Sequence, residues 1–217
     1  MKRYPIPAQE HRCEMKVANS HFIASLAPVF SVEEAKAFIS RIHSEFGDAS
    51  HNVPIFLVGH GDSVIAHCSD DGEPSGTAGR PALAVLKGSN LGDVAVVVTR
   101  YFGGTKLGTG GLVRAYGDAV REVVEKVPRA ERFPVYIVML GLPYSFFEQV
   151  RLLIRNYNGT ILDETFTHEV TITAQFILDR FPDFESALRE MSSDIIHAEI
   201  IETKDAIIPI VEQSSAK

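Results

Sequence analysis

Glycine is concentrated in one part of this 217-residue chain. Eleven of the sixteen glycines lie in residues 72–117, and the densest run occupies residues 103–111. This run follows the strand-like residues 94–99 and precedes a segment whose apolar residues have helical spacing. A glycine-rich turn between a strand and a helix places backbone amides at the positive end of the helix dipole, a geometry that binds anions. The spacing matches neither a P-loop nor a dinucleotide fingerprint, so it indicates phosphate in general.

Basic and aromatic side chains accompany these glycines. Arginine and lysine on both sides of the run and within it suit phosphate oxygens. Tyr101 and Phe102 could stack on nucleobases, although aromatic residues at the end of a strand also pack into cores. The alternative is that the glycines serve close packing alone and bind nothing. We expect a phosphate or nucleic-acid site whose candidate residues are Arg80, Arg100, Tyr101, Phe102, Gly103, Gly104, Lys106, Gly108, Thr109, Gly110, Gly111 and Arg114.

Three carboxylates, those of Asp70, Asp71 and Glu73, form a second candidate cluster. They could hold Mg²⁺ beside a bound phosphate, which would indicate phosphoryl or nucleotide chemistry. Two structural alternatives compete with this interpretation. The acids could cap a turn and the following helix, or one of them could form an ion pair with Arg100. Because the spacing is not that of a typical metal site, we expect no metal and no other cofactor.

No pattern of catalytic residues stands out. His51, His60 and His67 lie in one region, but without the spacing of a zinc site. The chain has no Gly-x-Ser-x-Gly elbow, and neither Cys13 nor Cys68 has a neighbour that would activate it as a nucleophile. We therefore assign no catalytic residues and leave enzymatic activity undecided, with the balance against it.

The composition, 45% hydrophobic and 23% charged, is that of a soluble globular protein and excludes disordered, collagenous and disulfide-rich classes. Two cysteines, no apolar stretch of membrane-spanning length and no signal-peptide pattern favour a cytoplasmic protein without a membrane partner. The formal charge of −7 is uneven, because residues 1–132 carry 15 basic and 15 acidic side chains and residues 133–217 carry 6 and 13. A phosphate-bearing partner is therefore compatible with the first part of the chain.

The spacing of apolar residues predicts two sets of elements, separated by a linker between Pro128 and Pro134. Before the linker, a capping box of Ser31 and Glu34 predicts the start of a helix. The elements expected there are strands at 13–17, 22–26, 54–58, 64–68 and 94–99 and helices at 32–46, 80–87 and 112–127. After the linker we expect strands at 135–142, 160–166, 170–177 and 195–202 and helices at 144–157 and 184–191. This β-α-β-β-α-β order is the ferredoxin-like arrangement.

Two long motifs resemble the YigZ/IMPACT family. They are Ser-Asp-Asp-Gly-Glu-Pro-Ser-Gly-Thr-Ala-Gly at 69–79 and Val-Val-Thr-Arg-Tyr-Phe-Gly-Gly-Thr-Lys-Leu-Gly-Thr-Gly-Gly-Leu at 97–112. The resemblance implies an α+β fold of two domains. Residues 1–132 would form an α/β domain similar to domain 2 of a small-subunit ribosomal protein and to domain IV of elongation factor G. Residues 134–205 would form a ferredoxin-like domain similar to domain V, followed by a tail at 206–217.

The same resemblance implies a role in translation. Eukaryotic members of the family regulate translation, and the bacterial branch is suspected of contact with nucleic acid or the ribosome. We therefore expect a cytoplasmic regulatory protein that binds RNA or the ribosome through the locally basic glycine-rich loop. The alternative is an enzyme that acts on a nucleotide or another phosphorylated small molecule held by the same loop. The oligomeric state stays open.

Overall fold

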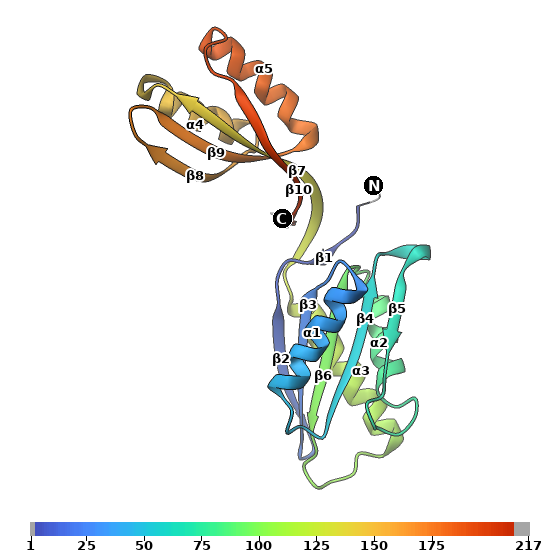
Figure 1. Ribbon diagram of the computed structural model, residues 1–217. Coiled ribbons are helices and arrows are strands. Elements are labelled where there is room, and N and C mark those ends of the chain that lie inside the picture. The colour runs from blue at the N-terminus through green and yellow to red at the C-terminus, as the bar shows by residue number, and fades with distance from the viewer. Residues whose placement is uncertain (1–2, 211–217) are drawn as a thin grey trace, which may run out of the picture. The chain divides into compact units, whose positions relative to one another are not determined.

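The computed structural model describes residues 3–210, which form two compact units (Figure 1). One unit contains the described residues up to Glu131 together with residues 208–210, and the other contains Arg132–Ile207. No helix within residues 3–210 combines the length and apolar character needed to cross a membrane. Each unit is described by itself below.

The first unit is a five-stranded antiparallel sheet with helices on both faces (Figure 1). The strands lie in the order β2 (His11–Val17), β3 (Ser20–Pro28), β6 (Val94–Tyr101), β4 (His51–Val58) and β5 (Ile65–Cys68). The 3-10 turn η1 (Gly61–Ser63) connects β4 to β5 and completes the hairpin that the sequence predicts. Helix α1 (Val32–Glu45) covers one face of the sheet, and α2 (Gly79–Gly88) and α3 (Gly108–Lys126) cover the other.

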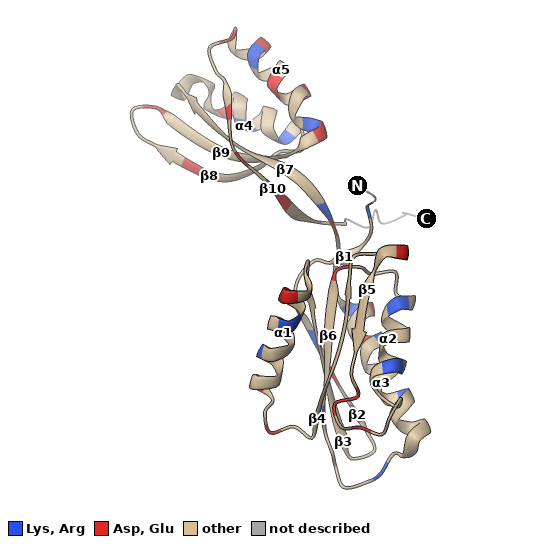
Figure 2. Cartoon of the chain, turned by 45° about the vertical axis from the view of Figure 1, so that its right-hand side comes forward, with Lys and Arg blue, Asp and Glu red and all other residues tan. Residues whose placement is uncertain are grey.

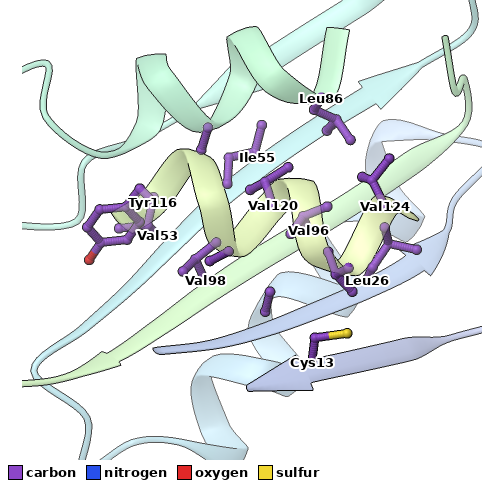
Figure 3. Close-up of a cluster of buried hydrophobic side chains, with 14 of the residues drawn as sticks. Cys13, Leu26, Val53, Ile55, Leu86, Val96, Val98, Tyr116, Val120 and Val124 are labelled. Atoms are coloured by element: carbon purple, nitrogen blue, oxygen red, sulfur yellow. The ribbon is translucent and has the colours of Figure 1, made fainter. Parts of the chain in front are cut away.

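The central strand β6 is buried on both faces, as its continuous apolar run predicts. Figure 3 shows Val96 and Val98 beside Val120 of α3, within the larger of two hydrophobic clusters. Ala95 and Val97 alternate with them and belong to the cluster on the α1 face. Burying one valine side chain completely contributes about 1.5–3 kcal/mol. Helices on both faces of the sheet therefore pack against β6. This packing fixes the position of the carboxyl end of the strand, at Tyr101.

Helix α1 begins with a modified capping box. The Ser31 hydroxyl accepts a hydrogen bond from the Glu34 amide at 3.0 Å, as expected. The Glu34 carboxylate accepts from the Phe30 amide at 2.8 Å, whereas in a standard capping box it would accept from the amide of the N-cap residue, here Ser31. The carboxylate thus accepts from an amide one residue earlier than expected. The reciprocal pair of side-chain hydrogen bonds at the start of the helix is retained.

The second unit confirms the predicted ferredoxin-like arrangement. Strand β9 lies between β7 and β8, antiparallel to both, and β10 pairs with the other side of β7. Its core includes Ile154, Phe176 and Phe184. The elements are β7 (Arg129–Leu142), η2 (Tyr144–Phe146), α4 (Phe147–Asn156), β8 (Thr160–Phe166), β9 (Val170–Ile177), η3 (Leu178–Arg180), α5 (Phe181–Ser192) and β10 (Ala198–Pro209). With the first unit, this gives the expected two-domain α+β fold.

Several element boundaries differ from those that the sequence suggests, and two of them concern the predicted linker and tail. Residues 129–134 are part of β7 rather than irregular, and the buried Ala130 pairs with Ile6 of the short strand β1 (Ile6–Pro7). The division between the two units, after Glu131, still falls within the predicted linker. The tail expected at 206–217 begins as part of β10, whose residues 206–208 are half-buried. The rest of that tail, from residue 211, lies outside the described residues.

Candidate functional site

A cavity of about 500 Å³ opens where β6 ends and α3 begins. We call it the β6–α3 cavity. Its size is typical of pockets that bind small ligands, which range from about 300 to 1,000 Å³. Its walls come from the start of β4, the segment before α2, the end of β6 and the start of α3. The lining residues are Ser50, His51, Glu73, Pro74, Arg100, Phe102, Lys106, Leu107, Gly108, Thr109 and Leu112.

The cavity brings together six of the residues predicted from the sequence. These are Glu73, Arg100, Phe102, Lys106, Gly108 and Thr109. Nine other candidates are not among its lining residues, namely Asp70, Asp71, Arg80, Tyr101, Gly103, Gly104, Gly110, Gly111 and Arg114. Five further lining residues were not predicted as phosphate or nucleic-acid contacts, namely Ser50, His51, Pro74, Leu107 and Leu112. His51 lies in the cavity because it pairs with Arg100 between β4 and β6. This pairing depends on the strand register, which the sequence pattern does not reveal.

Arg100 forms a buried ion pair with Glu73 at the floor of the cavity. Arg100 is 4% exposed, and its Nη1 donates to Oε1 of Glu73 at 2.6 Å. Its Nη2 donates to the Ser20 hydroxyl at 3.2 Å, and the guanidinium carbon lies 5.5 Å from the ring centres of Phe22 and Phe102. This is the ion-pair alternative that the sequence left open. The charge of Arg100 is thus neutralised within the fold.

Tyr116 also forms a hydrogen bond with Glu73. Its hydroxyl donates to Oε1 of Glu73 at 2.8 Å. Burial and this hydrogen bond raise the pKa of Tyr116 far above its usual value, so the hydroxyl remains a donor at physiological pH. The buried carboxylate therefore has two donors and one positive charge beside it, which offsets the cost of its desolvation.

Asp70 holds the segment that leads into α2. Its Oδ2 accepts from the Gly76 amide at 2.8 Å, and its Oδ1 accepts from the amides of Ala78 and Gly79 at 3.1 and 2.8 Å. Burial would raise the pKa of Asp70, but these three hydrogen bonds outweigh that effect and lower it. Asp70 thus caps the start of α2, which is one of the two structural alternatives that the sequence suggested for the acidic cluster. Its side chain is turned toward that helix.

Asp71 ties the same segment to β4. Its Oδ2 accepts from the Asn52 amide at 2.6 Å, and its backbone carbonyl accepts from Nδ1 of His51 at 2.7 Å. All three candidate carboxylates therefore have partners within the fold. Within residues 3–210, no three His, Cys, Asp or Glu side chains are grouped as a metal ion would require.

The start of α3 differs from the expected boundary. The helix begins at Gly108, so Gly110 and Gly111 lie in its first turn rather than in the loop. Positive φ occurs instead at Gly104 (+85°) and Gly108 (+72°), where the chain turns into the helix. Leu107 at the N-cap gives the helix no side-chain cap, so the first four amides have no partner within the helix. The predicted anion site would use these amides, and their binding of an anion stays a prediction.

Gly103 is required for close packing. A Cβ at this position would lie 1.7 Å from the carbonyl oxygen of Asn19, so only glycine allows the loop to approach the β2–β3 turn this closely. The packing alternative therefore accounts for one end of the glycine run. The anion-binding interpretation of the other end stays a prediction.

The predicted basic and aromatic residues around the cavity differ in their exposure. The loop of residues 102–107 carries one basic residue, Lys106, and no acidic residue (Figure 2). Arg80 is exposed in the first turn of α2, and Arg114 is exposed in the second turn of α3. Tyr101 is half-buried and donates to Oδ1 of Asp48 at 2.8 Å. Phe102 is 47% exposed, so of these two aromatic rings it is the one more open to a ligand.

Comparison with known proteins gives the family. Residues 18–124 match the Impact N-terminal domain, and residues 140–194 match a domain of unknown function (DUF1949). IMPACT family member YigZ of Escherichia coli (strain K12) is 34% identical over 193 residues, which is 88% of this chain and 95% of YigZ. IMPACT family member YvyE of Bacillus subtilis (strain 168) is 36% identical over 214 residues, 94% of each chain.

Solved structures are similar as well. The crystal structure of a hypothetical protein is 33% identical and covers 93% of this chain and 98% of its own, with a TM-score of 0.61. A second structure, of the two-domain translational regulator Yih1, is 25% identical over 56% of this chain and 46% of its own, with a TM-score of 0.34. The identity and coverage shared with YigZ and YvyE show that the chain belongs to the IMPACT family.

Proposed function

We propose that this protein takes part in translational regulation by binding RNA, free or within the ribosome, at the β6–α3 cavity. The observation that carries the proposal is that Lys106 and the uncapped start of α3 line the same cavity. Its cellular site of action would be the cytoplasm, where ribosomes and messenger RNA are found. The description of Yih1 as a translational regulator is in line with the part of the proposal that concerns translation.

The phosphate group is the part of RNA that this site suits. A lysine ammonium and several backbone amides offer hydrogen-bond donors and positive potential to phosphate oxygens. Of the basic residues in the first unit, Arg100 is paired with Glu73 and Arg121 with Asp118. Lys106 and Arg114 are exposed near the start of α3. They are therefore the side chains that we expect to neutralise backbone phosphates.

The enzymatic alternative receives less support. An enzyme acting on a phosphorylated small molecule would need Asp70, Asp71 or Glu73 as metal ligands or as a base. Each of these carboxylates accepts hydrogen bonds from other parts of the fold. Using one of them would require breaking contacts that hold α2, β4 or the cavity floor. We therefore favour a binding function.

The test is RNA and ribosome binding as a function of salt. We expect affinity for fluorescently labelled RNA to fall steeply as salt rises, because bound phosphates release counterions. Lys106→Ala should reduce the slope of log affinity against log salt by about 0.7, the contribution of one phosphate contact on a single strand. Lys87→Ala, which removes the same charge from the C-terminal end of α2, is the matched control. Undetectable binding, or equal effects of both variants, would contradict the proposal.

A further inference from the structure

We propose that a groove between α1 and β5 binds an extended peptide segment of a partner protein, which adds to the free edge of β5 and carries an acidic side chain. We call this groove, a cavity of about 670 Å³ in the first unit, the α1–β5 groove. Its apolar residues include Ile39, Phe56 and Ile65, and its polar residues include Lys36 and Ser40. The inference is independent of the proposed function, because the groove shares no lining residue with the β6–α3 cavity.

Strand β5 forms one edge of its sheet, and no strand within residues 3–210 pairs with its outer side (Figure 1). The Ser69 amide, just after β5, donates to the carbonyl of Pro54 at 3.2 Å, so these two opposite residues form a hydrogen-bonded pair. Hydrogen-bonded and non-hydrogen-bonded pairs alternate along antiparallel strands. Ala66, three positions before Ser69, therefore directs its N–H and C=O away from β4. These backbone groups are available to a further strand.

The two edge strands of this sheet differ in their side chains. The other edge strand, β2, carries Arg12, Glu14 and Lys16. Charged side chains on an edge strand discourage pairing with another chain. β5 consists of Ile-Ala-His-Cys, without Lys, Arg, Asp or Glu, and its Ile65 is 54% exposed. β5 thus lacks the charges that protect the opposite edge of the sheet.

One face of β5 continues the apolar surface on which α1 packs. His67 lies opposite Phe56 of β4, and the two rings stack with 5.3 Å between their centres. Ile65 lies opposite Val58, so it is on the same face of the sheet. Phe56 and Val58 pack in the hydrophobic cluster beneath α1, whereas Ile65 stays exposed. Every second side chain of an added strand would lie on this face, beside the apolar residues of the groove.

Lys36 and Ser40 make the groove suitable for a carboxylate. They lie four positions apart on α1, so their side chains are neighbours on one side of the helix. Both residues are exposed, and neither side chain has an ion pair or hydrogen bond with another residue among those described. None of the described lining residues is acidic. An ammonium group and a hydroxyl donor side by side favour an Asp or Glu side chain on the bound segment.

An acidic peptide fits these features better than a second copy of the chain or an RNA strand. Two copies paired through β5 would bring together two Lys36 side chains and no carboxylate from the described lining residues. RNA could offer a phosphate to Lys36, but it has no peptide backbone to continue the sheet beside Ala66. A peptide strand uses both the free edge and the positive charge.

Nuclear magnetic resonance of the ¹⁵N-labelled full chain tests the inference with one synthetic peptide, Thr-Val-Thr-Glu-Thr-Val-Thr, blocked at both ends. In an extended strand, its two valines and its glutamate share one face. We expect saturable shifts of the amide signals of residues 64–69 and of Lys36. Exchange of the Ala66 amide hydrogen with solvent should slow, because that amide becomes hydrogen-bonded.

Matched peptides and variants separate backbone pairing from charge. Two forms of the peptide, N-methylated at alternate residues on opposite edges, should differ in affinity about tenfold, because only one edge pairs with β5. Replacing the glutamate by glutamine should weaken binding about two- to fivefold, the contribution of an exposed ion pair. Lys36→Gln should cause the same loss for the glutamate peptide and none for the glutamine peptide. Lys87→Gln, which removes the same charge from α2, should have no effect.

The outcomes distinguish this inference from the proposed function. Absence of shifts at millimolar peptide, or equal binding of the two N-methylated forms, would overturn strand addition at β5. A dimer of the protein alone that pairs through β5, or displacement of the peptide by single-stranded RNA, would assign the groove to another occupant and overturn the inference as well. None of these results bears on RNA binding at the β6–α3 cavity, and Lys106→Ala should leave peptide binding unchanged.

Discussion

Arg100 and Glu73, 27 positions apart in the sequence, form a buried ion pair with 2.6 Å between Nη1 and Oε1. Glu73 is 7% exposed and also accepts a hydrogen bond from Tyr116. The pair joins the end of β6 to the segment before α2. It also means that the positive charge available to a ligand comes from Lys106 and the start of α3.

Removing one partner of this pair should be costly. Arg100→Met leaves the Glu73 carboxylate buried beside Tyr116 without a compensating charge, and such a loss destabilises proteins by about 3–5 kcal/mol. Urea-induced unfolding measures the effect. The double variant Arg100→Met with Glu73→Leu should recover most of the loss, because no charge is left buried. A single variant as stable as the parent would contradict the assignment.

The two ends of the glycine run should respond differently to alanine. Gly103→Ala places a Cβ against the Asn19 carbonyl and should destabilise the protein. At Gly110, nothing lies within 4 Å of an added Cβ. Because Gly110 lies in α3, alanine there should leave stability unchanged or raise it by up to about 1 kcal/mol. Thermal unfolding compares the two variants, and equal losses would show that the run acts as one packing unit.

The sequence predicted the elements better than the contacts between them. The continuous apolar residues of β6 and the period-two and helical spacings elsewhere depend only on local pattern, and they predicted the sheet, the helices and the ferredoxin-like order. The partner of Arg100 and the place of His51 in the cavity depend on strand register and on the path of residues 70–79, which no local pattern encodes. The start of α3 was misplaced because glycine is typical of loops, although Gly110 and Gly111 are helical here.

Acid should weaken the fold through Asp70. Three backbone hydrogen bonds lower its pKa in the folded state, despite the opposing effect of burial. A carboxyl group with a lowered pKa contributes stability above its unfolded pKa of about 3.9, and this contribution is lost as pH falls through that value toward the folded pKa. Asp70→Asn should therefore be less stable at neutral pH and less sensitive to acid below about pH 4.

Unfolding free energies measured across this pH range check the prediction. Asp62→Asn, a change at an exposed carboxylate in the β4–β5 connection, serves as the control. If Asp70→Asn loses stability in acid as steeply as the parent protein, Asp70 is not a source of the pH dependence.

The central claim is that RNA binds at the start of α3, and nuclear magnetic resonance of the ¹⁵N-labelled full chain tests it most directly. Titration with a single-stranded RNA should shift the amide signals of Lys106, Gly108, Thr109 and Gly110 most strongly. Signals from β8 and α5 of the second unit should move little. Shifts confined to the second unit, or unchanged amide signals at the start of α3 when RNA is bound, would contradict the account.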